Sequence, residues 1–207
     1  MPGRGARAER PPIVLPNPPL VAGALHLRAP AERDIEAIHA ACQDPLIVRY
    51  TRLPHNYSRR DARAFVFGAP ARRDAGISLE LVASDLDDGS LTGVVGLVVD
   101  RYDWERAEIG YWTDPAHRGR GIAGTALALL ARWALGPGGF VRGELTAPVH
   151  NRPSLAVAER AGFRREGVAR ASWPTPQGRE DMAVYSLLSG DLGPPSPAGR
   201  PGVGNRT

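Results

Sequence analysis

The segment Glu108–Gly124, with the sequence EIGYWTDPAHRGRGIAG, constrains the fold of this chain more than any other segment. It predicts a strand over residues 106–113, a short loop from Asp114-Pro115, and a helix over residues 121–135. Glycine in such a loop lets successive backbone N–H groups point outward at the start of the helix, where the helix dipole favours an anion. The loop arginines add charge-assisted donors. The segment therefore predicts a diphosphate-binding loop made mainly of backbone, although a strand–helix turn without a ligand would show the same glycine spacing.

Two common classes of phosphate-binding loop are excluded. Gly119, Gly121 and Gly124 form a literal GxGxxG, but the motif follows a long Asp-Pro loop. No acidic residue about 20 positions later ends a second parallel strand, so the surroundings do not fit a Rossmann unit. All 26 basic side chains are arginine, which excludes a Gly-Lys-Ser/Thr phosphate loop and any lysine nucleophile.

Hydrophobic patterns and turn residues predict a mixed α/β fold for the rest of the chain. Ser58 stands three residues before Asp61, as in a capping box at a helix N-terminus, and Gly162 is typical of a helix end. The expected strands cover residues 24–29, 77–84, 91–99, 106–113, 141–147, 163–171 and 180–188. The expected helices cover residues 31–42, 62–67, 121–135 and 153–161.

Composition divides the chain into one domain and two tails. Residues 1–20 and 189–207 contain 17 of the 44 glycines and prolines, and such segments bury too little apolar surface to offset their chain entropy. We therefore expect disordered tails over residues 1–21 and 189–207, and one domain over residues 22–188. Most of the net charge of +4 lies in the tails, so the domain does not predict a nucleic-acid surface.

The sequence also bears on metals, disulfides and membranes. The single cysteine, Cys42, excludes an internal disulfide and a multi-cysteine metal site. The sequence has no apolar stretch of about 18 residues and does not open with a charged-then-apolar leader. We expect a cytoplasmic protein, monomeric or homodimeric, that holds no metal and contacts no membrane.

The stretch Arg118-Gly-Arg-Gly121-Ile-Ala123 resembles the Gln/Arg-x-x-Gly-x-Gly/Ala signature of the GNAT acyltransferase superfamily. Five further stretches, in the same order, resemble its RimJ/RimL branch, which acetylates protein N-terminal amines. They are LHLRAPAERD (25–34), EIGYW (108–112), Asn151-Arg-Pro-Ser154, AERAGF (158–163) and GREDMAVYSLL (178–188). The resemblance covers about residues 22–188. It implies a central, mostly antiparallel sheet flanked by helices, with a V-shaped splay between the strands 106–113 and 141–147.

The resemblance further implies that acetyl-CoA lies in this splay as a co-substrate. Asn151 would hold the amide arm of acetyl-CoA, and the Ser154 hydroxyl would serve the departing thiolate. Judged as single residues, Asn151 equally fits a turn and Ser154 a helix cap. The positions expected at the cofactor are Trp112, Thr113, Arg118, Gly119, Arg120, Gly121, Ile122, Ala123, Gly124, Asn151 and Ser154.

The chain departs from the family pattern at the general base. Several relatives carry a glutamate 19 residues after the serine, and that position is Trp173 here. Glu108 is our replacement candidate, because a carboxylate beside the splay can collect a proton directly or through water; it would otherwise pair with an arginine. Glu166 and His117 are weaker candidates, and His150 is more typical of a loop.

The missing glutamate favours an acceptor amine of low pKa, since an α-amine near 7.7–8.0 is already partly deprotonated at neutral pH. We therefore expect acetyl transfer to a protein or peptide N terminus. A small-molecule amine, such as an antibiotic or a metabolite, is the alternative acceptor, and a longer acyl group is an alternative donor. A third alternative is a catalytically weak acyl-CoA-binding module. The residues considered for the acceptor side are Arg49, Tyr50, Arg52, His55 and Tyr57.

Overall fold

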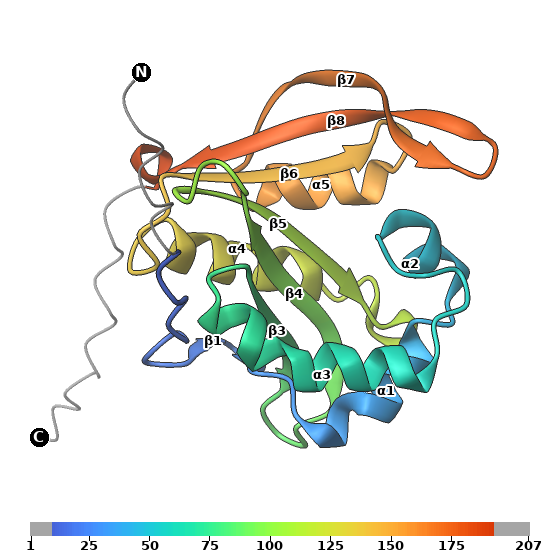
Figure 1. Ribbon diagram of the computed structural model, residues 1–207, viewed down its shortest axis with the longest axis vertical. Coiled ribbons are helices and arrows are strands. Elements are labelled where there is room, and N and C mark those ends of the chain that lie inside the picture. The colour runs from blue at the N-terminus through green and yellow to red at the C-terminus, as the bar shows by residue number, and fades with distance from the viewer. Residues whose placement is uncertain (1–9, 193–207) are drawn as a thin grey trace, which may run out of the picture.

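The computed structural model describes residues 10–192, which form one eight-stranded sheet with the order β1-β2-β3-β4-β5-β6-β8-β7 (Figure 1). Every neighbouring pair is antiparallel except β5 and β6. The strands are β1 (Leu20–Ala22), β2 (Leu25–Arg28), β3 (Ser78–Asp85), β4 (Leu91–Val99), β5 (Arg106–Thr113), β6 (Arg142–Pro148), β7 (Arg164–Thr175) and β8 (Gly178–Leu188). The expected mixed α/β fold with a mostly antiparallel sheet is confirmed.

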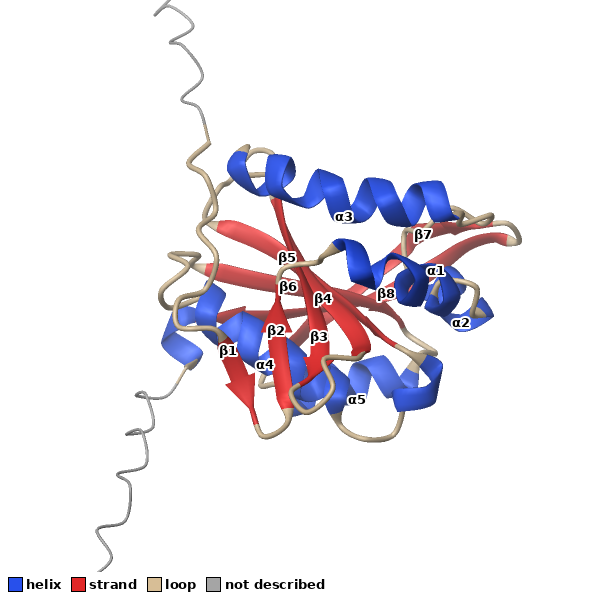
Figure 2. Cartoon of the chain, turned by 90° about the horizontal axis from the view of Figure 1, so that it is seen from below, coloured by secondary structure: helices blue, strands red, loops and turns tan. Residues whose placement is uncertain are grey.

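Helices cover both faces of the sheet. The α-helices are α1 (Ile35–Ala41), α2 (Pro45–Tyr50), α3 (Arg59–Asp74), α4 (Ile122–Ala134) and α5 (Arg152–Arg160). Short 3-10 turns lie at Glu32–Asp34, Pro115–His117 and Ser189–Asp191. Helix α3 lies on one face, and α4 and α5 lie on the other (Figure 2).

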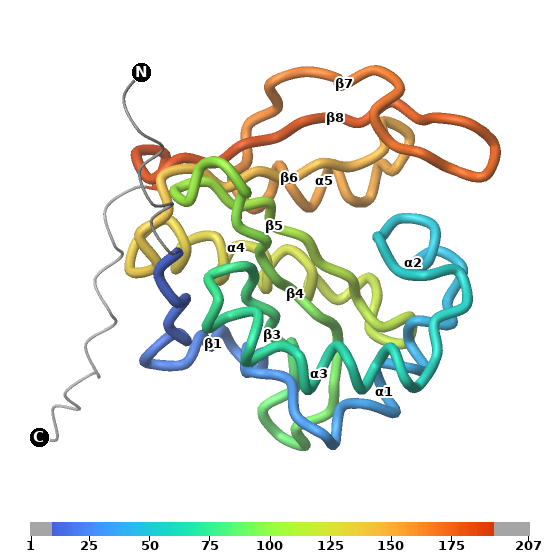
Figure 3. Tube along the Cα trace, viewed as in Figure 1, coloured from blue at the N-terminus to red at the C-terminus, as the bar shows by residue number. Residues whose placement is uncertain are grey.

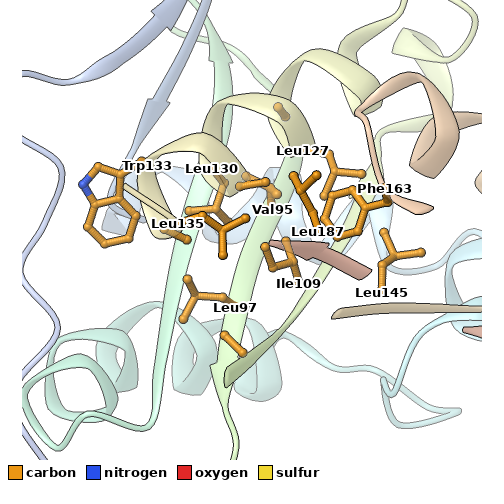
Figure 4. Close-up of a cluster of buried hydrophobic side chains, with 14 of the residues drawn as sticks. Val95, Leu97, Ile109, Leu127, Leu130, Trp133, Leu135, Leu145, Phe163 and Leu187 are labelled. Carbon is orange, nitrogen blue, oxygen red and sulfur yellow. The ribbon is translucent and has the colours of Figure 1, made fainter. Parts of the chain in front are cut away.

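The main core lies between the sheet and α4. This helix is apolar almost all round, and its Leu127, Leu130 and Ala131 have no exposed surface. They pack with Val95 and Ile109 of the central strands, as Figure 4 shows for the labelled members of the cluster. Because α4 is fixed in this way, the loop before it is held at one end of β5.

Two helices differ from the sequence predictions. The capping box of α3 forms as expected, since Asp61 accepts from the Ser58 backbone N–H at 2.8 Å. The helix then runs to Asp74 and passes Pro70, because its apolar face packs on the sheet and tertiary packing outweighs local propensity. Helix α2 was not predicted as a separate helix; Pro45 begins it and Asp44 caps its first turn.

The predicted splay between β5 and β6 is present. Their pairing extends over three positions, from Arg106↔Arg142 to Glu108↔Glu144, whereas β4 pairs with β5 over seven. Figure 1 shows the two strands side by side at their starts and diverging toward the end where α2 lies. The fold therefore leaves one edge of β5 open in the middle of the sheet.

The predicted tail boundaries need correction. A disordered tail over residues 1–21 is wrong for residues 10–21, because Ile13 is buried in the main core and its N–H donates to Arg73 O at 3.0 Å. At the other end, Leu192 packs against the same core. A few buried apolar side chains are enough to fix these segments once a core is there to receive them. The tail predictions for residues 1–9 and 193–207 lie outside the described residues.

No helix within residues 10–192 is long and apolar enough to cross a membrane.

Candidate active site

A continuous cleft opens where β5 and β6 diverge. Its volume is about 1040 Å³, and its lining comes from both strands, the loop before α4, the start of α5, α2 and the β7–β8 hairpin. That hairpin projects past the end of β6 on the same side of the molecule as α2 (Figure 3). The lining residues include two regions at its ends, which we call the first mouth, at the start of α4, and the second mouth, between α2 and the hairpin.

The loop before α4 forms an anion cradle at the first mouth. Gly119 and Gly121 have φ values of 78° and 76°, in the left-handed region that glycine adopts without strain. Gly121 is the N-cap of α4 and no side chain caps the helix. Within the described residues, none of the six N–H groups from Gly119 to Gly124 has an acceptor. Free N–H groups at a helix N-terminus suit a phosphate.

The loop arginines differ in position. Arg118 lines the cleft and donates to Asp44, the cap of α2, at 2.6 and 3.3 Å. The Arg118 hydrogen bonds hold the pKa of the Asp44 carboxyl below its usual value. Arg120, which was also expected at the cofactor, is exposed and does not line the cleft. Arg118 thus connects the cradle to the acceptor-side helix.

The open edge of β5 is defined by strand alternation. The Asp114 N–H donates to Thr92 O at 2.9 Å, so Trp112 also directs its backbone toward β4. Tyr111 and Thr113 therefore direct their backbone groups toward the gap, where β6 no longer pairs. Thr113 is at the position expected for pairing with an extended ligand, whereas Trp112 lines the cleft with its side chain alone.

Ser154 and Asn151 occupy the start of α5. The Asn151 side chain caps this helix by accepting from the Ser154 N–H at 3.3 Å, so the cap is Asn151 and not Ser154. The Ser154 hydroxyl lies 3.0 Å from the Tyr111 hydroxyl. Burial raises the pKa of Tyr111, although the hydrogen bond to Ser154 opposes the shift. Tyr111 therefore keeps its proton at neutral pH and can donate it to Ser154, which leaves the serine proton free to point into the cleft.

Glu108 lies in the cleft on the opposite face of β5, since Ile109 points into the main core. One nitrogen of Arg52 donates to both carboxylate oxygens of Glu108, at 2.9 and 2.8 Å. Thr146 donates to the same carboxylate at 3.3 Å. The arginine pairing considered from the sequence is therefore present, and it brings the acceptor-side residue Arg52 onto Glu108.

Trp173 lies at the second mouth, with the Arg52 guanidinium 5.6 Å from its ring centroid. A bulge in β7 between Ala169 and Trp173 places it there. Asp181 accepts from the Ala171 N–H at 2.7 Å and fixes the bulge, where Ala171 has a φ of 50°. Trp173, with the Arg52 guanidinium over its ring, therefore stands at the position where several relatives carry the glutamate.

The weaker base candidates lie in different places. Hydrogen bonds from Arg142 and Ser186 lower the pKa of Glu166 to about 2, and Glu166 does not line the cleft. His117 lines the cleft and bonds Asp114 at 2.8 Å. His150 also lines it, with Nε2 3.8 Å from Glu180.

The acceptor-side candidates are also divided. Tyr50 and Arg52 line the cleft, whereas His55 and Tyr57 do not. Arg49 does not line the cleft either; it borders the second mouth through the cleft-lining His150, 3.5 Å away, and also donates to Glu180 at 3.5 Å.

Sequence reasoning missed two functional contacts. Tyr111 was quoted within EIGYW but not singled out, although its alternation with Trp112 could have placed it on the Ser154 side. The Asp44–Arg118 contact joins residues 74 positions apart and had no local signal. Within residues 10–192, no group of three or more His, Cys, Asp or Glu side chains could hold a metal ion.

Comparison with known proteins agrees with this geometry. Residues 24–164 match the family of acetyltransferase (GNAT) domains. The chain is 38% identical to the putative ribosomal N-acetyltransferase YdaF of Bacillus subtilis over 104 residues, which are 50% of this chain and 56% of YdaF. It is 35% identical to the ribosomal-protein-serine acetyltransferase of Escherichia coli over 82 residues, 40% of this chain and 46% of that protein. The chain thus spans about half the length of the curated relatives it matches.

Solved structures share the fold over most of both chains. Mycobacterium smegmatis RimJ in complex with CoA-disulfide has a TM-score of 0.73 and 25% identity, covering 84% of this chain and 87% of RimJ. RimL in complex with coenzyme A has a TM-score of 0.74 and 23% identity, covering 82% of this chain and 97% of RimL. The cradle, the splay and the family match lead to one conclusion: this chain belongs to the GNAT acetyltransferase-domain family, with RimJ/RimL-like relatives.

Proposed function

We propose that this protein transfers the acetyl group of acetyl-CoA to a primary amine, the α-amine of a protein or peptide N terminus. The observation that carries the proposal is the run of six free N–H groups at the start of α4, beside the open edge of β5. These two features fit the two ends of one ligand, a diphosphate and an extended amide arm. The names of the relatives, which include ribosomal-protein acetyltransferases, support the choice of acceptor.

We infer one orientation for acetyl-CoA from the cradle and the open edge of β5. The cradle takes the diphosphate through backbone N–H groups, and Arg118 lies close enough to add charge. The pantetheine amides pair with the free backbone of Tyr111 and Thr113, as an added strand would. This direction carries the thioester toward the start of the splay, between Ser154 on one face of β5 and Glu108 on the other.

The chemistry is direct attack of the amine on the thioester carbonyl. A free backbone N–H of β5 can stabilise the oxyanion that develops on the carbonyl oxygen. Ser154, polarised by the Tyr111 hydroxyl at 3.0 Å, donates to the departing thiolate. Glu108 collects the proton that the amine loses, directly or through water.

The experiment measures release of coenzyme A with acetyl-CoA and a panel of acceptors. Peptides with free N termini should be acetylated, the same peptides with blocked N termini should not, and aminoglycosides and polyamines should react poorly. A preference for the small amines would instead identify the acceptor as a metabolite or an antibiotic, with the same acetyl-transfer chemistry. Binding of acetyl-CoA without transfer to any amine would leave a binding module and refute the proposal. Cytoplasmic location and a monomeric or homodimeric state remain predictions.

A further inference from the structure

We propose that Arg52 selects acceptors that carry a carboxylate close to the reacting amine, such as the side chain of an acidic second residue. This inference rests on the proposed function and names the acceptor class of the same site. Arg52 and Glu108 form an ion pair at the second mouth, with one cationic and one anionic group in direct contact at 2.8 and 2.9 Å. A molecule with an ammonium next to a carboxylate is complementary to such a pair, with its ammonium on Glu108 and its carboxylate on Arg52.

Arg52 keeps donors available for a second carboxylate. Glu108 uses only one of the three guanidinium nitrogens, and within the described residues Nε and Nη1 of Arg52 donate to no other group. The Arg52 side chain is 62% exposed, against 36% for Glu108. Charge-assisted N–H bonds from a guanidinium to a carboxylate are stronger than neutral ones, and a guanidinium offers donors in several fixed directions, unlike lysine. The Nε–H and Nη1–H donors of Arg52 can therefore each bond a substrate carboxylate oxygen while Nη2 stays on Glu108.

Trp173 holds the guanidinium in position. The cation–π contact at 5.6 Å limits the freedom of Arg52, and the β7 bulge fixes Trp173 itself. Two backbone carbonyls of the bulge, Ala171 O and Ser172 O, accept from Arg179. An arginine fixed between a tryptophan and a glutamate loses less side-chain entropy when it binds a ligand than a mobile one does.

The charges around the mouth favour the same acceptor class. Arg49 borders it with a side chain 55% exposed, and its partner Glu180 is only 26% exposed. The arginines therefore reach further into solvent than the carboxylates that neutralise them. A polycationic acceptor meets these cations first and is repelled, whereas an anionic group is attracted.

The test compares two acceptors that differ only in charge, the peptides Ser-Asp-Ala-Ala and Ser-Asn-Ala-Ala. We expect kcat/KM for the acidic peptide to be higher by about ten-fold or more in the parent protein, since a charge-assisted pair replaces a neutral one. The preference should fall toward one in Arg52→Gln and lie between these limits in Arg52→Lys. The matched control is Arg63→Gln: Arg63 stacks on Phe67 outside the cleft, and the preference should remain.

A second measurement needs no variant. The preference of the parent protein should shrink between about 0.05 and 0.5 M salt, because an exposed ion pair is screened. Free aspartate serves as a third acceptor. If the parent protein acetylates it and Arg52→Gln does not, the proposal is supported and the acceptor is a free amino acid. Equal kcat/KM for both peptides, or a preference unchanged in Arg52→Gln, would overturn the inference and leave the proposed function standing. Absence of transfer to every amine would instead overturn the proposed function.

Discussion

The hydroxyl of Ser154 gives the sharpest test of the chemistry, because the structure separates its catalytic role from a structural one. Asn151 caps α5, so Ser154→Ala leaves the helix cap intact. The change removes one hydrogen bond, to Tyr111 at 3.0 Å, which stabilises the fold by about 1 kcal/mol. Alanine is a better helix former by about 0.5 kcal/mol. The net loss is therefore under about 1 kcal/mol, or less than about 4 °C in Tm.

The expected loss of activity is much larger. If the hydroxyl donates to the departing thiolate, Ser154→Ala should lower kcat by about 10- to 1000-fold, the range for one positioned donor or acid. KM for acetyl-CoA should change little, since the cradle holds the diphosphate. Tyr111→Phe keeps the serine but removes the hydroxyl that orients it, and should give a smaller loss of kcat.

The assay combines initial rates of coenzyme A release with Tm on the same preparation. Ser58→Ala is the matched control, because Ser58 caps α3 away from the cleft. It should lose about 1 kcal/mol of stability and keep its kcat per folded molecule. A Ser154→Ala protein with the parent kcat would refute the role given to the hydroxyl, whatever its Tm.

Three further predictions concern the cradle, the base and the stability of the fold. Acetyl-CoA at 100 times its Kd should raise Tm by about 5–10 °C, and Gly121→Asp should abolish this rise because it puts a negative charge at the diphosphate. Gly139→Asp is the control and should keep the rise, since Gly139 has the same φ of 76° and an equally open Cβ position. Glu108→Gln should lower kcat/KM by about 100-fold at pH 7, a deficit that narrows toward pH 9 as the α-amine loses its own proton; a deficit constant with pH would limit Glu108 to holding Arg52. Burial raises the pKa of Asp34, but hydrogen bonds from Arg28 and from the Ala31 N–H, each at 2.7 Å, together with the charges of Arg28 and Arg33, lower the pKa overall. This carboxylate therefore stabilises the fold above its unfolded pKa near 3.9 and loses that contribution as pH falls. Asp34→Asn should therefore cost about 3 kcal/mol at pH 7 and progressively less below about pH 4, as measured by denaturant unfolding.

The sequence predicted the parts of the fold that have a local signal. The ranges 91–99 and 106–113 agree with β4 and β5, since apolar runs between turn residues define them. Helix α2 has a local start signal in Asp44-Pro45, but it is only six residues long, too short for a helical period to be recognised. Residues 10–21 were assigned to a tail because proline and glycine are frequent over residues 1–20 taken together, while the burial of Ile13 depends on a core made elsewhere.

The candidate site also has parts that the sequence predicts and parts that it does not. Backbone features such as the left-handed glycines of the cradle follow from residue types in one short segment. The Ser154 role was open between a cap and a donor, and only the geometry of Asn151 and Tyr111 separates them. The Arg52–Glu108 contact spans 56 positions and depends on how far the α2–α3 connection reaches across the sheet. Long-range pairing of this kind has no periodicity to detect in a single sequence.

The divergence of β5 from β6 divides the one sheet into two groups of strands that share only a short pairing. Strands β1–β5 follow one another in chain order, β6–β8 form a second group, and three paired positions join them. The amides of Tyr111 and Thr113 should therefore exchange with solvent deuterium as fast as those of an outer strand, although they lie in the interior of an eight-stranded sheet. A ligand that bonds to this edge would slow their exchange and couple the opening of the two strand groups more tightly, so that the bound substrate would become part of what holds the sheet together.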